Sequence, residues 1–142
     1  GHIRLVRFIR TQREKWQKMI GRYYDYADQY RKVARKVTLV HDATGVGNVI
    51  EDYLPEGSVG FEFKGKARDA LLNDYVIAIE GGRLTAPMIE WMYDEHDKAR
   101  VEDLDGSKHL PDSIAMGSLA VWGLDPENVE GEEKKKMGTW RS

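Results

Sequence analysis

A run of strand-forming residues at 37–40 and the aspartate just beyond it constrain this chain more than any other feature. Residues 37–40 (VTLV) favour a buried strand, and Asp42 follows two positions after it. Gly45 and Gly47 let the backbone turn sharply, and residues 49–54 read as helical. Because ligands and catalytic groups of open α/β sheets collect beyond the carboxyl ends of the strands, we expect Asp42 to lie in a functional site.

Two other interpretations of the same stretch stay open. The spacing Gly45-x-Gly47 is compatible with a phosphate-binding loop of a nucleotide-binding fold. The third glycine of a dinucleotide fingerprint and the Lys-Ser/Thr pair of a P-loop are both missing, however. In the other interpretation, Asp42 only caps the next helix and the glycines only turn the chain.

Length and composition describe an ordinary globular domain. The chain has 142 residues, of which 41% are hydrophobic and 32% charged, and this length fits one domain with a core. The net charge of −2 argues against a strongly basic nucleic-acid binder, although a local basic patch is compatible with it. The absence of cysteine excludes disulfides and thiolate metal sites, which fits the cytoplasm. No run approaches the roughly 18 apolar residues of a membrane span, so we expect no membrane association.

Periodicity predicts strands and helices in alternation. The predicted strands are 2–10, 36–40, 58–63 and 99–104, with a short extended piece at 83–86. The predicted helices are 12–32, 49–54, one that follows 64–68 and ends at Gly81, 87–96 and 111–122. Thr11 and Glu14 are expected to form a capping box at the start of the first helix. Residues 124–142 are expected to be a charged tail, disordered or acting as a linker.

A second carboxylate opens the last predicted helix. Taken alone, Asp112 is a first-turn acid favoured by the helix dipole, and His109 is a structural hydrogen-bonding residue. If the fold brings Asp112 to Asp42, the two carboxylates suit Mg²⁺ or Mn²⁺, with waters and a substrate phosphate as further ligands. Two such ions about 4 Å apart would promote phosphodiester cleavage. A site for two ions requires a third carboxylate. The candidates for it are Asp105, Asp103 and Glu90.

Several motifs occur in a characteristic order along the chain. They are residues 39–47 (LVHDATGVG), a strand ending at 61–63 (FEF), a basic residue opening a helix, 81–87 (GGRLTAP) and 109–120 (HLPDSIAMGSLA). In this order and spacing they resemble the C-terminal nuclease domain of phage terminase large subunits. The resemblance covers about residues 2–123.

The resemblance implies an α/β, RNase H-like fold, with a central mixed β-sheet flanked by helices, over residues 1–123. It implies a metal-dependent endonuclease that cuts concatemeric double-stranded DNA during genome packaging in the host cytoplasm, alongside other terminase subunits or the portal. Asp42 and Asp112 match metal ligands of a Mg²⁺ or Mn²⁺ site with two ions, and His109 matches a histidine that assists positioning.

Basic residues near these motifs are candidate contacts to DNA phosphates. They are Arg13, Lys15, Lys64, Lys66 and Arg68. Either Lys66 or Arg68 matches the family's basic residue at the start of the middle helix. Phosphate contacts of this kind would make DNA binding dependent on salt.

The chain also departs from the family pattern. The first two strands and their catalytic aspartate have no counterpart, so the domain is expected to be N-terminally truncated and weakly active or inactive alone. The strand at 2–10 should then pair with the strand before Asp42, or the exposed edges should recruit another chain, such as a second copy. The rival hypothesis is a non-catalytic DNA-packaging assembly module with the same fold.

Overall fold

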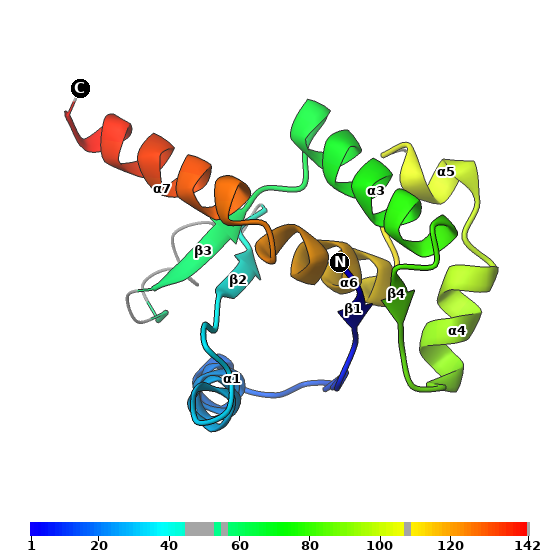
Figure 1. Cartoon of the computed structure of the whole chain (residues 1–142), viewed down its shortest axis with the longest axis horizontal. Coiled ribbons are helices and arrows are strands. Elements are labelled where there is room, and N and C mark those ends of the chain that lie inside the picture. Colours follow the sequence, from blue (N-terminus) through cyan, green and yellow to red (C-terminus); the bar gives the residue numbers. More distant parts are fainter. Residues whose placement is uncertain (45–52, 55–56, 107–108, 142) are drawn as a thin grey trace.

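The computed structural model describes residues 1–44, 53–54, 57–106 and 109–141. Helices alternate with short strands, so the predicted α/β class is confirmed (Figure 1). The elements in chain order are β1 (Ile3–Arg4), α1 (Trp16–Arg31), β2 (Leu39–Asp42), β3 (Ser58–Phe61), α3 (Gly65–Glu80), β4 (Leu84–Thr85), α4 (Glu90–Asp97), α5 (Val101–Leu104), α6 (Asp112–Gly123) and α7 (Pro126–Arg141). Gly45, Gly47 and most of the helix predicted at 49–54 lie outside the described residues.

The described strands form two separate parallel pairs instead of the single central mixed sheet that was expected. β2 pairs with β3, and Asp42 lies opposite Phe61 in their register. β1 pairs with β4, so the predicted strand at 2–10 is reduced to its first residues and does not join β2. Beyond Leu5, whose N–H donates to the Thr85 carbonyl oxygen (2.8 Å), the chain runs toward α1, where the Arg7 guanidinium lies over the Tyr26 ring.

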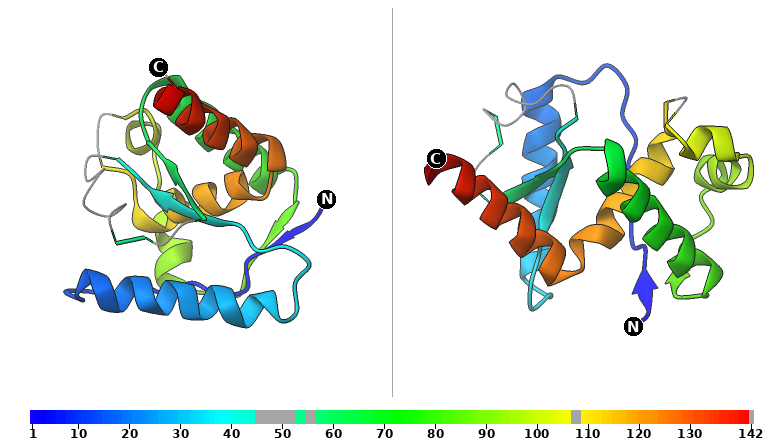
Figure 2. Two further views of the ribbon diagram at one scale, coloured as in Figure 1. Left: turned by 90° about the vertical axis from the view of Figure 1, so that its left-hand side faces the viewer. Right: turned by 90° about the horizontal axis from the view of Figure 1, so that it is seen from above.

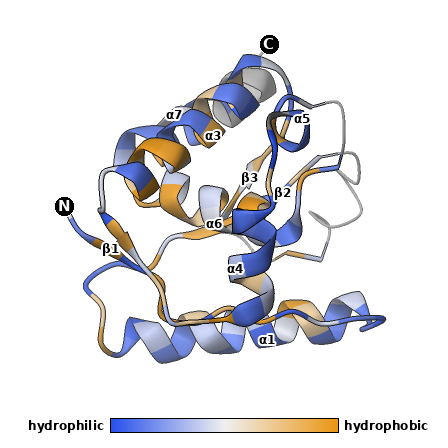
Figure 3. Cartoon of the chain, turned by 90° about the vertical axis from the view of Figure 1, so that its right-hand side faces the viewer, coloured by the Kyte–Doolittle hydropathy of each residue, from blue (hydrophilic) through white to orange (hydrophobic). Residues whose placement is uncertain are grey.

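Helices surround the β2–β3 pair on several sides. The pair lies between α1 on one side and α7 on the other, and α6 passes close to it (Figures 1 and 2). Hydrophobic residues concentrate on α3, α6 and the strands, whereas α4 is mainly hydrophilic (Figure 3). None of the described helices has the length and apolar character needed to cross a membrane.

The core lies where α3 and α6 pack together against β3. Its buried members are Phe61, Leu71, Leu72, Tyr75, Leu110, Ile114 and Leu119. Gly117 makes the close approach of the two helices possible, since a Cβ atom there would lie 2.5 Å from the Tyr75 hydroxyl oxygen. This packing anchors α6, and with it the position of Asp112.

Two local predictions were wrong: the capping box at the start of the first helix and the strand at 99–104. The predicted capping box does not form: α1 begins at Trp16, and Glu14 instead pairs with Arg22 through both carboxylate oxygens, at 2.6 and 2.9 Å. Residues 101–104, predicted as part of a strand, form helix α5. There the Asp103 carboxylate accepts a hydrogen bond from the Arg100 backbone N–H (2.8 Å), and such a cap favours a helix start.

The end of the chain is helical, which corrects the expectation of a disordered tail. Pro126 occupies the first helical position of α7, where its missing N–H costs nothing, and Asp125 caps the helix by accepting from the Glu127 N–H (3.0 Å). Val129 is buried, and α7 packs on β3 and α6. Local caps and one apolar contact therefore outweigh the high charge of this segment.

Candidate functional site

A surface cavity of about 690 Å³ contains both carboxylates that the sequence singled out. Asp42 reaches it from the carboxyl end of β2, and Asp112 from the first residue of α6. His109 lines the same cavity from the segment before α6. Elements that are far apart in the chain thus bring the three predicted catalytic residues to one place.

Asp42 is held by a turn that follows directly on its strand. Its Oδ1 accepts a hydrogen bond from the Thr44 N–H (2.8 Å), and the Thr44 hydroxyl oxygen accepts one from the Phe63 N–H (2.7 Å). An aspartate that bonds the backbone two residues on is typical of a turn. These contacts link the ends of β2 and β3 and orient the Asp42 carboxylate at the cavity.

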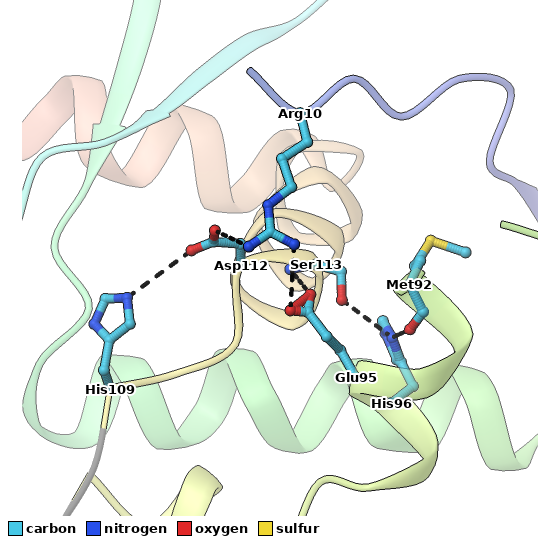
Figure 4. A network of polar contacts seen from close by, with 7 residues as sticks. All are labelled: Arg10, Met92, Glu95, His96, His109, Asp112 and Ser113. Atoms are coloured by element: carbon cyan, nitrogen blue, oxygen red, sulfur yellow. Dashed lines mark hydrogen bonds and ion pairs between the residues drawn. The ribbon is translucent and has the colours of Figure 1, made fainter. Parts of the chain in front are cut away.

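Asp112 has a basic side chain near each of its two oxygens (Figure 4). The Arg10 Nη2 lies 3.4 Å from Asp112 Oδ2, and the His109 Nε2 lies 3.9 Å from Asp112 Oδ1. The Asp112 side chain is 54% exposed, so these pairs are weak, and the first turn of a helix favours the carboxylate as well. These contacts orient the Asp112 carboxylate without sealing it from water.

The first turn of α6 is capped from another helix. Glu95 of α4 accepts a hydrogen bond from the Ser113 N–H with its Oε1 (3.1 Å), while its Oε2 lies 3.9 Å from the Arg10 Nη1. A backbone donor at the start of α6 is thus satisfied without Asp112. This arrangement leaves the Asp112 side chain directed to the cavity, Arg10 and His109 (Figure 4).

A partly buried hydrogen-bond network links α3 and α4 to the first turn of α6. His96 Nδ1 lies 2.8 Å from the Met92 carbonyl oxygen, which can only accept, so Nδ1 carries the proton. In the neutral ring, Nε2 then accepts from the Tyr75 hydroxyl (2.8 Å). Burial raises the pKa of Tyr75 to about 12, so this hydroxyl stays protonated at neutral pH. The network joins α3 to α4, and the Ser113 hydroxyl, 3.4 Å from His96 Nδ1, extends it to α6.

The predicted phosphate contacts fall into two groups. Lys64 and Arg68 line the cavity, whereas Arg13, Lys15 and Lys66 are exposed and not among its described lining residues. Lys64 pairs with Glu62 (2.7 Å). Arg68 is only 8% exposed, and its Nη1 donates to the Leu104 carbonyl oxygen (2.5 Å). Arg68 therefore holds α5 against α3, a structural role that sequence reasoning did not anticipate.

The carboxylates fit a cation site in part. Among the third-ligand candidates, Asp105 lines the cavity, Asp103 caps α5, and Glu90 opens α4 outside the described lining. Within the described part of the chain, no three His, Cys, Asp or Glu side chains are grouped so that they could hold a metal ion. Asp42 and Asp112 line the same cavity, and a hard cation bound there would need waters and substrate oxygens to complete its shell.

Sequence reasoning missed Arg10 and Glu95. Arg10 falls within the strand predicted at 2–10, and no pattern in the sequence pairs it with Asp112. No protein-family model matches the chain, and comparisons with curated proteins and with solved structures give no significant match. The chemistry of the cavity is therefore inferred from its own residues and from the resemblance in motif order.

Proposed function

We propose that this chain belongs to a metal-dependent DNA endonuclease, the RNase H-like nuclease domain of a phage or prophage terminase large subunit. It would cut concatemeric double-stranded DNA during genome packaging in the host cytoplasm. One observation carries the proposal: Asp42 and Asp112, the two residues that match the family's metal ligands, line a single cavity although they come from different elements.

Each residue of the cavity has a proposed task. Asp42 and Asp112 would hold Mg²⁺ or Mn²⁺, and two further carboxylates, Asp69 and the predicted third-ligand candidate Asp105, line the same cavity. When bound, the cation would lower the pKa of a water and stabilise the leaving oxygen. The Lys64 ammonium at the cavity would attract a DNA phosphate, and the exposed imidazole of His109 would position substrate beside Asp112.

The incomplete set of ligands limits what the chain should do alone. The described residues bring two of the predicted ligands to the cavity, and a two-ion site demands more. We expect weak cation binding and slow or absent cleavage unless other residues or subunits of the packaging machinery complete the site.

A non-catalytic assembly module with the same fold is the second candidate. It is favoured by the absence, among the described residues, of a group of three metal-ligating side chains. Such a module could pair with other terminase subunits, the portal or a second copy through a strand edge. Size-exclusion chromatography with light scattering would show the second copy as a dimer.

Isothermal titration calorimetry with Mn²⁺ tests the nuclease proposal. We expect measurable binding by the unmodified chain, and a loss of at least about tenfold in affinity in both Asp42→Asn and Asp112→Asn, because each removes a ligand charge. Asp25→Asn is the matched control, since Asp25 lies exposed on α1 away from the cavity. Equal binding by all four proteins, or binding by none, would contradict a cation site at this cavity.

A further inference from the structure

Residues 6–10, called here the N-terminal strap, cross from β1 toward α1 and are held by aromatic contacts on two sides. The Arg7 guanidinium lies 4.7 Å from the centre of the Tyr26 ring on α1. On the α4 side, the Phe8 ring packs edge-on against Trp91, with 5.1 Å between ring centres. Because both contacts fix the strap, they also fix where its last residue, Arg10, can reach.

Arg10 has three neighbours, of which Asp112 lines the cavity. Its Cζ lies 5.1 Å from the centre of the Trp91 ring, within the range of a cation–π interaction. Its Nη1 lies 3.9 Å from Glu95 Oε2, and its Nη2 lies 3.4 Å from Asp112 Oδ2 (Figure 4). The Arg10 side chain remains 43% exposed, so none of these contacts is sealed from water.

The contact with Asp112 is the one that a cation would compete for. An arginine and a divalent ion cannot both occupy the same side of one carboxylate oxygen at close range. The ion pair is long and partly exposed, so it contributes little free energy and can be displaced. Trp91 and Glu95 do not depend on Asp112 for their hold on Arg10, so the guanidinium can release Asp112 while the strap stays in place.

We propose that Arg10 is an internal counter-ion of Asp112 and competes with the divalent cation for that carboxylate. In the absence of the cation, Arg10 neutralises Asp112. In its presence, Arg10 gives up Asp112 and keeps its contacts with Trp91 and Glu95. The inference rests on the proposed function, because it takes Asp112 to be a cation ligand. Its consequence is that the strap lowers the cation affinity of the site.

The sign of the effect makes the proposal testable by Mn²⁺ calorimetry on the full chain. Removing a residue of a binding site usually weakens binding, whereas Arg10→Gln should tighten Mn²⁺ binding by about two- to fivefold, the scale of an exposed ion pair. Arg10→Lys keeps the charge and should stay close to the unmodified chain. The gain in Arg10→Gln should shrink at high salt, because screening weakens the competing ion pair.

Two controls separate this effect from a loosened strap. Arg4→Gln removes an exposed charge of β1 and should leave Mn²⁺ affinity unchanged. Arg7→Gln loosens the strap at Tyr26 while Arg10 stays, and should change affinity less than Arg10→Gln. Thermal unfolding by circular dichroism confirms that each variant is folded before titration.

The outcomes distinguish this proposal from the one it rests on. If Arg10→Gln leaves Mn²⁺ affinity unchanged or weakens it while Asp112→Asn abolishes binding, the counter-ion role is wrong and the cation site stands. If neither the unmodified chain nor Arg10→Gln binds Mn²⁺, both proposals fail. A gain in Mn²⁺ affinity in Arg10→Gln that is absent in Arg10→Lys would support the counter-ion role.

Discussion

Helices α6 and α1 are packed differently: Asp112 lies on α6, whereas Arg10 lies on the strap, which contacts α1 at the Tyr26 ring. α6 buries Ser113, Ile114, Ser118, Leu119 and Gly123 among α3, α4 and the β2–β3 pair. Within α1, all of which the structure describes, Ala27 is the one buried residue. α1 is held to β2 by the Tyr23 hydroxyl, which donates to the Val40 carbonyl oxygen (2.8 Å), and to the strap by the Tyr26 ring.

This difference separates a rigid support from an adjustable one. Asp112 lies on a helix that close packing fixes, as a ligand needs if it is to be held in place before binding. Arg10 lies on a strap held by polar and aromatic surface contacts, each of which contributes little free energy and can be broken separately. The proposed release of Asp112 by Arg10 would be easier from this second kind of element.

The largest expected difference between the two helices is in the free energy of unfolding when one glycine of each helix is replaced by alanine. Gly117→Ala places a Cβ atom 2.5 Å from the Tyr75 hydroxyl oxygen, so the ring must move, and we expect the free energy of unfolding to fall by about 3 kcal/mol. Gly21→Ala in α1 meets nothing within 4 Å and should raise it by about 0.5–1 kcal/mol, because alanine favours a helix interior. Urea unfolding measures both. Equal effects of the two substitutions would show that α6 is no more tightly packed than α1.

The second-largest expected effect is a fall in the free energy of unfolding at alkaline pH, which arises from Tyr75 in the packing between α3 and α6. Burial raises the pKa of Tyr75 to about 12 from an ordinary value of 10.0. Between these values the folded state keeps a proton that the unfolded state has lost, so the free energy of unfolding falls as pH rises. The loss reaches about 2 kcal/mol and is absent below pH 10.

Thermal melts between pH 9 and pH 12 check this prediction. Tyr75→Phe should flatten the decline, since it removes the titrating group, although Tyr23, whose pKa burial also raises, will leave some slope. A decline that is equally steep in Tyr75→Phe would place the alkaline sensitivity elsewhere in the chain.

Loosening the attachment of α1 to β2 should change the free energy of unfolding least. Tyr23→Phe removes the hydrogen bond to the Val40 carbonyl oxygen and should lower the free energy of unfolding by about 0.5–1.5 kcal/mol. Tyr30→Phe is the control on the same helix, because the Tyr30 hydroxyl has no hydrogen bond among the described residues, and it should change little. Urea unfolding compares the two. A loss above about 3 kcal/mol in Tyr23→Phe would show that α1 is part of the core.

Local signals predicted several elements well. The glycines at 81 and 82 end α3 close to where the sequence indicated, and the proline and aspartate at 111 and 112 open α6. Other local signals were present and were misread. Asp125 and Pro126 form an ordinary helix start, but the charge of the segment that follows suggested disorder. Asp103 lies three residues after Arg100, which is the spacing of a capping box. Both residues fall in the segment 99–104, which was predicted to be a strand.

The sequence by itself determined the α/β class, the strand that delivers Asp42 and the helix that begins at Asp112, because strand and helix propensities, caps and turns act over a few residues. Only the tertiary structure decided that these two carboxylates share a cavity, that Arg68 is buried under α5, and that Arg10 and Glu95 meet beside Asp112. These contacts join residues from different elements, and their geometry follows from how α3, α4 and α6 pack. No spacing along the chain encodes that packing directly.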